Sequence, residues 1–99
     1  MAQQHTLSKN NTTVKTRDGE TVVTLHHTDV VRFDDKQITL DNGGWVTATT
    51  CTRMNQASSQ FGLGFRVSRK DGGMFVQVKE AEGWGPKIAF TGSTANFSR

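Results

Sequence analysis

The sequence predicts an α+β fold: a strongly curved antiparallel sheet, or a small partly open barrel, of about six to eight short strands with one helix near residues 50–61. Two observations support this fold class. Short runs rich in β-branched and aromatic residues alternate with turn residues along most of the 99-residue chain. One segment departs from that pattern and carries apolar side chains at helical spacing. Short antiparallel strands of this kind can close into a curved sheet, with the helix across one face or one open end.

The chain is long enough for one domain only. Residues 1–11 are polar and lack any periodicity, so we expect a flexible polar arm there. Residues 12–91 hold the strand-like runs and the helical segment, and they form the predicted single α+β domain. Residues 92–99 are polar again, and we expect a polar C-terminal tail.

Five strands are expected before the helix, and turn residues separate them. Asp18-Gly19 is a strong signal for a tight hairpin turn between the first two. Asp34-Asp35 turns the chain after the third strand. The four residues 41–44 form a dense turn, in which we expect positive φ at one or more of the last three positions. The expected strands cover residues 12–17, 20–26, 29–33, 36–40 and 45–48.

Residues 49–61 fit a helix better than a strand. Thr49 or Thr50 can cap its N-terminus, and Gly62 stands where a helix-ending glycine is expected. Serine and threonine make the intrinsic helix propensity of this segment poor, so tertiary packing has to hold it. The packing stripe, at spacings of three and four residues, consists of Met54, Ala57 and Phe61.

The segment after the helix predicts a hairpin and a last strand. Residues 65–69 and 74–80 pair in the same register whether the loop between them has two or four residues, with Val67 opposite Val76. One face of this hairpin is then apolar and the other polar. A last strand is expected at residues 87–91, with Ile88 and Phe90 pointing inward. Of the two tryptophans, one is expected in the core, and Trp84 is the better candidate for an exposed position.

Composition narrows the functional classes. Twelve Lys and Arg against nine Asp and Glu give a net charge of +3, which permits a nucleic-acid partner without requiring one. No apolar stretch is long enough to span a membrane. The single cysteine, Cys51, allows no internal disulfide and favours a reducing cytoplasm. Residues 1–5 lack the basic start and apolar stretch of a signal peptide.

No catalytic or metal motif stands out. The neighbouring His26 and His27 would point to opposite faces of a strand and could not both bind one ion, and His5 lies in the expected arm. We therefore predict no metal and no cofactor. Cys51 near a helix N-terminus, with one of these histidines as base, is the best enzymatic case. A small residue filling space explains Cys51 at least as well, so we predict a protein that is not an enzyme.

The outer face of the 65–80 hairpin is the predicted binding surface. It places basic side chains around an aromatic ring, a combination that suits phosphates and base stacking. A two-stranded ribbon also fits the major groove of a duplex. Two other interpretations stay open: ordinary solvated charges with Phe75 against the C-terminal segment, or a protein interface anchored by aromatic and arginine side chains. The predicted binding residues are Arg66, Lys70, Phe75, Gln77, Lys79 and Trp84.

Several short motifs stand between residues 21 and 65: Thr24-Leu25-His26, Phe33-Asp34-Asp35, Gly43-Gly44-Trp45 with Thr47, Thr49 and Thr50, Arg53-Met54-Asn55, and Phe61-Gly62-Leu63-Gly64. In this GGW-x-T-x-TT, RMN and FGLG pattern the chain resembles a group of small, uncharacterised proteins encoded by tailed bacteriophages. The resemblance covers nearly half of the chain. It implies a phage accessory protein that works in the cytoplasm of an infected bacterium or in a virion, and it carries no assigned activity.

Together these observations predict a phage accessory protein that acts by binding a macromolecule of the host or the phage. Nucleic acid and protein are nearly equal as expected partners, and no membrane is expected. A minor virion component or self-assembling protein is the first alternative, and a Cys51-dependent enzyme is the second. The sequence leaves the oligomeric state open.

Overall fold

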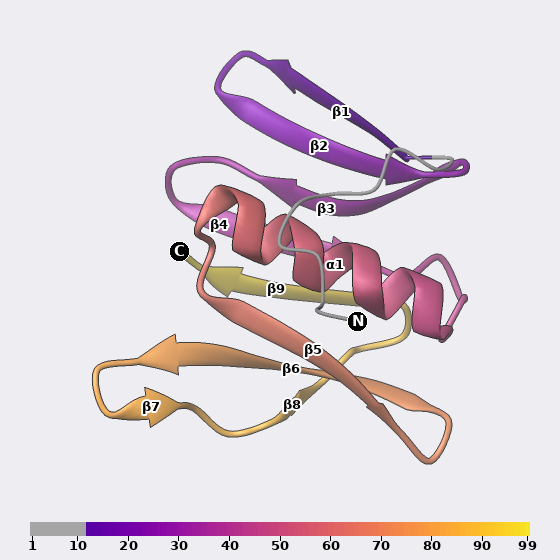
Figure 1. Ribbon diagram of the computed structural model, residues 1–99, viewed down its shortest axis with the longest axis vertical. Helices are drawn as coiled ribbons and strands as arrows, with labels where there is room; N and C mark the ends of the chain where they lie inside the picture. Colours follow the sequence, from indigo (N-terminus) through magenta and orange to yellow (C-terminus); the bar gives the residue numbers. More distant parts are fainter. Residues whose placement is uncertain (1–11) are drawn as a thin grey trace, which may run out of the picture.

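The computed structural model describes residues 12–99, which form two antiparallel sheets and one helix (Figure 1). The first sheet has the order β1-β2-β3-β4-β9 and the second has the order β5-β6-β7, with β8 also paired to β6. The first sheet consists of β1 (Thr12–Arg17), β2 (Glu20–Leu25), β3 (Thr28–Phe33), β4 (Gln37–Asp41) and β9 (Thr94–Ser98). The remaining elements are α1 (Ala48–Phe61), β5 (Phe65–Lys70), β6 (Gly73–Glu80), β7 (Gly83–Trp84) and β8 (Ile88–Ala89).

The α+β class, with antiparallel strands and one helix, is confirmed. The strongly curved sheet or partly open barrel is wrong, because the nine strands of residues 12–99 separate into two open sheets. The chain leaves the first sheet after β4, forms α1, and then begins a new sheet with β5. The expected arm, residues 1–11, lies outside the described residues.

Two tight turns follow the sequence signals closely. Asp18-Gly19 has φ values of 53° and 81°, and Asp71-Gly72 has φ values of 53° and 79°. Positive φ at both central residues matches the right-handed twist of the strands that such a turn joins, and Asp-Gly adopts it readily. The second turn sets the predicted register, in which Val67 lies opposite Val76.

The segment after β4 differs from the prediction. Residues 45–48 form no strand; instead α1 begins at Ala48, with Thr47 as its N-cap and not Thr49 or Thr50. Gly43 and Gly44 have φ values of 60° and 86°, so positive φ in this turn is confirmed. The turn redirects the chain, and the Trp45 N–H bonds the Asn42 carbonyl at 2.8 Å instead of a neighbouring strand. The helix ends as expected, at Gly62 with φ of 63°.

The C-terminal segment also carries structure. Within the expected polar tail, residues 94–98 form β9 and pair with β4. Ala95 is buried, and the Phe97 ring packs edge-on against Phe65 with a centroid distance of 5.7 Å. The expected inward position of Ile88 is wrong: its side chain is 47% exposed, because β8 is a two-residue strand on the outer edge of β6.

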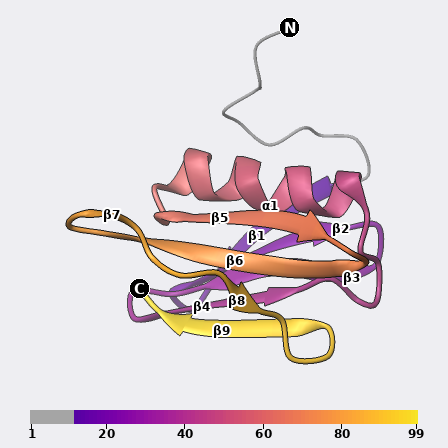
Figure 2. The ribbon, with the colours of Figure 1, turned by 90° about the horizontal axis from the view of Figure 1, so that it is seen from below.

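The core lies where the first sheet, α1 and the second sheet meet (Figures 1 and 2). α1 crosses the first sheet and runs beside β5. The Phe61 ring, at the end of the predicted apolar stripe, packs on Phe33 at a centroid distance of 5.2 Å. The most fully buried side chains are Val23, Val30, Val31, Ile38, Leu40, Met54 and Val76.

A polar stripe on α1 binds the backbone of β5. The Ser58 hydroxyl donates to the Phe65 carbonyl at 2.6 Å and accepts from the Phe65 N–H at 3.1 Å. One turn earlier, the Asn55 amide donates to the Val67 carbonyl at 2.9 Å and accepts from the Val67 N–H at 2.7 Å. Phe65 and Val67 are two residues apart, so the stripe bonds the edge of β5 as a neighbouring strand would. These bonds explain why α1 carries the polar residues Asn55 and Ser58 on the side that faces β5.

Candidate functional site

The predicted binding residues lie on the second sheet, and four of them come together. Arg66 lies opposite Gln77, and Lys79 lies opposite Trp84, so all four side chains share one face. The Arg66 guanidinium stacks 4.4 Å from the Trp84 ring centroid, and its Nε–H donates to Gln77 Oε1 at 3.0 Å. The Gln77 amide in turn donates to the Gly85 carbonyl at 2.9 Å. We call the six predicted residues on this sheet the basic face.

The other two members of the basic face lie further along the hairpin. Phe75 is half-buried and lies between Ser68 and Ala89 in the sheet, so it is not the ring that the cations surround. Lys70 stands at the hairpin turn, opposite Gly73. The aromatic side chain beside the cations is Trp84, which is 40% exposed. The sequence pattern placed Phe75 among the cations, whereas the ring that contacts the Arg66 guanidinium is that of Trp84.

The cations of the basic face have no acidic partners among residues 12–99. The ion pairs of the described chain lie on β1 to β3, where Arg32 bonds Asp29 at 2.7 Å and Glu20 at 3.2 Å. The remaining pair is an exposed one between Arg17 and its neighbour Asp18.

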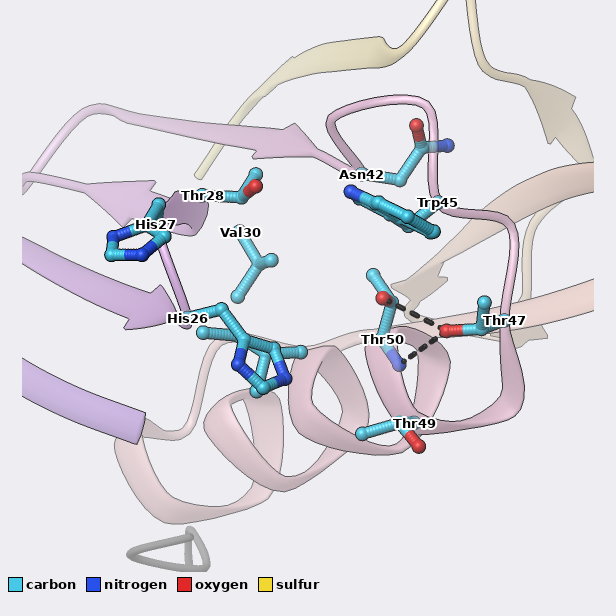
Figure 3. Close-up of a pocket in the computed structure, with 10 residues that line it drawn as sticks. His26, His27, Thr28, Val30, Asn42, Trp45, Thr47, Thr49 and Thr50 are labelled. Carbon is cyan, nitrogen blue, oxygen red and sulfur yellow. Dashed lines mark hydrogen bonds between the residues drawn. The ribbon is translucent and has the colours of Figure 1, made fainter. Parts of the chain in front are cut away.

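A separate pocket of about 510 Å³ lies where the β2–β3 turn faces the start of α1 (Figure 3). Leu25 and Val30 form its buried floor, and Trp45, 65% exposed, forms one wall. We call it the Trp45 pocket. Its lining consists of Leu25, His26, His27, Thr28, Val30, Asn42, Trp45, Thr47, Thr49 and Thr50.

The backbone around the Trp45 pocket is closely constrained. His26 adopts φ of 56°, a left-handed conformation that is uncommon for a residue with a side chain. Gly43 packs on Thr28 so closely that an added Cβ would lie 2.8 Å from the threonine side chain. Thr47 caps α1 by accepting from the Thr50 N–H at 3.3 Å. These contacts hold the two turns and the helix start in place.

Sequence reasoning did not find the Trp45 pocket. It assigned Trp45 to a strand and expected one of the two tryptophans in the core, whereas Trp45 and Trp84 are both exposed. The available signal was a large ring directly after two glycines and just before a helix, which favours an exposed ring in a turn.

The family model for the Kyanoviridae Gp96 protein matches residues 1–95 of the chain. The chain belongs to the Kyanoviridae Gp96 family. The expected origin in tailed bacteriophages is thereby confirmed, while the match does not single out the motif residues on which the resemblance rested. No curated protein and no solved structure is significantly similar to this member of the Gp96 family.

Cys51 of this Gp96 family member faces β5, outside the Trp45 pocket. Its thiol donates to the Val67 carbonyl at 3.1 Å, and the Asn55 amide approaches the sulfur at 3.7 Å. Burial raises the pKa of the Cys51 thiol. A half-buried thiol with a raised pKa is a weak nucleophile at neutral pH.

Two further properties concern residues 12–99. This part of the chain holds no cluster of three or more His, Cys, Asp or Glu side chains suited to a metal ion. Its helix, α1, is too short and too polar to cross a membrane.

Proposed function

We propose that this phage protein acts by binding rather than by catalysis, and that its basic face binds single-stranded nucleic acid. The observation that carries the proposal is the Arg66 guanidinium stacked on Trp84 with no carboxylate partner in the described chain. The stacked pair offers a planar surface to a base, and Lys79 and Lys70 offer charges to phosphates.

The sheet around the hairpin favours a single strand over a duplex. A ribbon that enters a major groove needs two strands with open flanks. Here β7 and β8 flank β6, and the polar stripe of α1 occupies the edge of β5. A broad surface with an exposed aromatic ring suits unstacked bases better.

The proposal of a non-catalytic role rests on Cys51 and on the Trp45 pocket. The thiol is engaged by β5, and burial raises its pKa. The pocket is lined by histidines and threonines and contains neither Cys51 nor a carboxylate that could orient a histidine as a base.

A fluorescence-anisotropy titration with labelled single-stranded and duplex oligonucleotides tests the proposal. We expect tighter binding of the single strand at low salt, and a weakening of about tenfold for Trp84→Ala. Lys79→Ala should reduce the slope of log K against log salt by about 0.7 if it contacts one phosphate. Lys15→Ala, which removes an exposed cation from β1, is the matched control and should bind like the wild type.

Three results would contradict the proposal. They are no binding at low salt, equal binding by Trp84→Ala, and preference for the duplex. A pull-down from infected cells with nuclease-treated and untreated arms covers the protein alternative. A protein that is retained after nuclease treatment and lost in Trp84→Ala would assign the basic face to a protein interface.

Self-assembly as a virion component is the less favoured function. β1 is an edge strand of the first sheet, and such edges can pair with another chain. It carries Lys15 and Arg17, however, and charged side chains on an edge oppose that pairing. We expect a monomer by light scattering and no copies of the protein in purified phage particles.

A further inference from the structure

The Trp45 pocket has a lining of unusual charge character. None of its ten lining residues is Asp, Glu, Lys or Arg, and its ionisable groups are the two histidines. Leu25 and Val30 line the pocket with buried apolar side chains, and the Trp45 side chain that lines it is 65% exposed. Its volume of about 510 Å³ falls in the range of small-molecule sites. This lining suits an uncharged, flat group.

The polar groups of the lining fall into two sets. Asn42, Thr47 and Thr50 are used internally: Asn42 accepts from the Gly44 N–H at 2.8 Å, and the two threonine hydroxyls bond each other at 3.1 Å. The second set has no side-chain hydrogen bond to any residue of the described chain. It consists of His26, His27, Thr28 and Thr49.

The side chains of this second set favour some ligands of the pocket over others. A purely apolar guest, such as a leucine or phenylalanine side chain, would strip water from these groups and give them no partner, which is unfavourable. A heteroaromatic ring can stack on Trp45 and offer donors and acceptors at its edge. Histidine and threonine can serve as either donor or acceptor, so they suit such an edge.

We infer that the Trp45 pocket binds a nucleobase, with the ring stacked on Trp45 and its polar edge bonded to His26, Thr28 and Thr49. The site is distinct from the basic face, and the inference stands whether or not that face binds nucleic acid. The close packing of Gly43 on Thr28 and the capped start of α1 keep the pocket open before the guest arrives.

A titration of the ¹⁵N-labelled full chain with adenosine, guanosine, cytidine and uridine, followed by NMR, tests this inference. We expect at least one nucleoside to shift the Trp45 indole N–H and the amides of Thr28 and Thr49 in a saturable way. Trp45→Ala should weaken that binding about tenfold or more. Because Trp45 is 65% exposed, this variant should keep its fold, which its own spectrum verifies.

Ile88→Ala is the matched control, since it shortens an exposed apolar side chain on β8 outside the pocket. It should bind the nucleoside like the wild type. Nucleoside affinity should also be nearly independent of salt, because no lining side chain carries a permanent charge.

N-acetyl-phenylalaninamide serves as the competing probe. Tighter binding of this amide than of every nucleoside would overturn the inference and assign the pocket to an aromatic side chain of a protein. The inference also fails if no nucleoside gives saturable shifts at millimolar concentration, if the shifts follow Trp84 instead of Trp45, or if Trp45→Ala binds as tightly as the wild type.

Discussion

The two sheets of this protein differ in how their arginines are partnered. Residues 12–41, in the first sheet, hold six acidic and four basic side chains, whereas residues 65–89, in the second, hold three acidic and five basic ones. Arg32 in the first sheet lies between Asp29 and Glu20. Arg66 in the second stacks on Trp84 and bonds an uncharged glutamine. The same residue type is neutralised on one sheet and left available on the other.

This difference shows that the net charge of a whole protein can conceal a basic surface. The +3 total hides a slightly acidic sheet and a basic one. A cation already paired with carboxylates gains little from a phosphate, because binding would break the existing pair. The contrast between Arg32 and Arg66 can be tested directly. The bonds by which α1 holds the second sheet can be tested as well.

The largest expected effect comes from detaching the second sheet from the helix. Asn55→Ala would leave the N–H of Val67 without its partner and its carbonyl with only the weak bond from the Cys51 thiol, and should lower the free energy of unfolding by about 2–4 kcal/mol. Urea denaturation measures the loss. Ser59→Ala, at an exposed position of α1, is the control and should change stability by less than about 0.5 kcal/mol. Equal stability of the two variants would contradict the interpretation that the polar stripe links α1 to β5.

The next largest effect separates the two arginines in binding. Arg66→Ala should weaken binding of a single-stranded oligonucleotide about tenfold, whereas Arg32→Ala should leave it unchanged. Arg66→Lys keeps the charge and loses the planar stack on Trp84, so its affinity should fall between wild type and Arg66→Ala. Anisotropy at fixed salt measures all three. Equal losses for Arg32→Ala and Arg66→Ala would mean that net charge alone drives binding.

A smaller effect is expected on folding stability, where Arg32 matters because of its ion pairs. Arg32→Ala leaves Asp29 and Glu20 without their shared cation and should cost up to about 1 kcal/mol, since all three side chains are more than two-fifths exposed. The cost should shrink at high salt, which screens exposed charges. Thermal unfolding at two salt concentrations measures it. A loss that is unaffected by salt would indicate packing by the Arg32 side chain rather than ion pairing.

The smallest effect concerns acid. Asp34 accepts from the N–H groups of Lys36 and Gln37, both at 2.8 Å, and these bonds hold the pKa of its carboxyl below 3.8. A lowered pKa in the folded state stabilises the fold above the unfolded value, and the contribution is lost as pH falls through the folded pKa. In Asp34→Asn, the free energy of unfolding should therefore fall slightly less steeply as the pH drops below about 4. A steeper decline in that variant would contradict this assignment.

Local signals predicted the parts of the fold that local geometry controls. Asp18-Gly19, Asp71-Gly72 and Gly62 need positive φ, and this requirement is visible in the sequence. The basic face followed from strict alternation on β5 and β6, although Trp84 could be placed beside Arg66 only by β7 pairing with β6.

The remaining differences depend on contacts between distant segments. β9 pairs with β4, and Thr39 bonds Asn96 across 57 positions of sequence, so no local pattern could identify that strand. Residues 45–47 have strand-like composition but do not join the sheet, because the preceding glycines turn the chain toward α1. The Trp45 pocket therefore required the three-dimensional arrangement of two turns and a helix start.

The position of β9 has a consequence for synthesis of the chain. β4 is complete at Asp41, but its neighbour begins at Thr94, about fifty residues later. At roughly 5–20 residues per second, the ribosome needs about 3–10 s to deliver that neighbour. During this interval the edge of β4 is open to strands of other nascent chains. A chain that ended just before Thr94 would keep this edge of β4 open permanently.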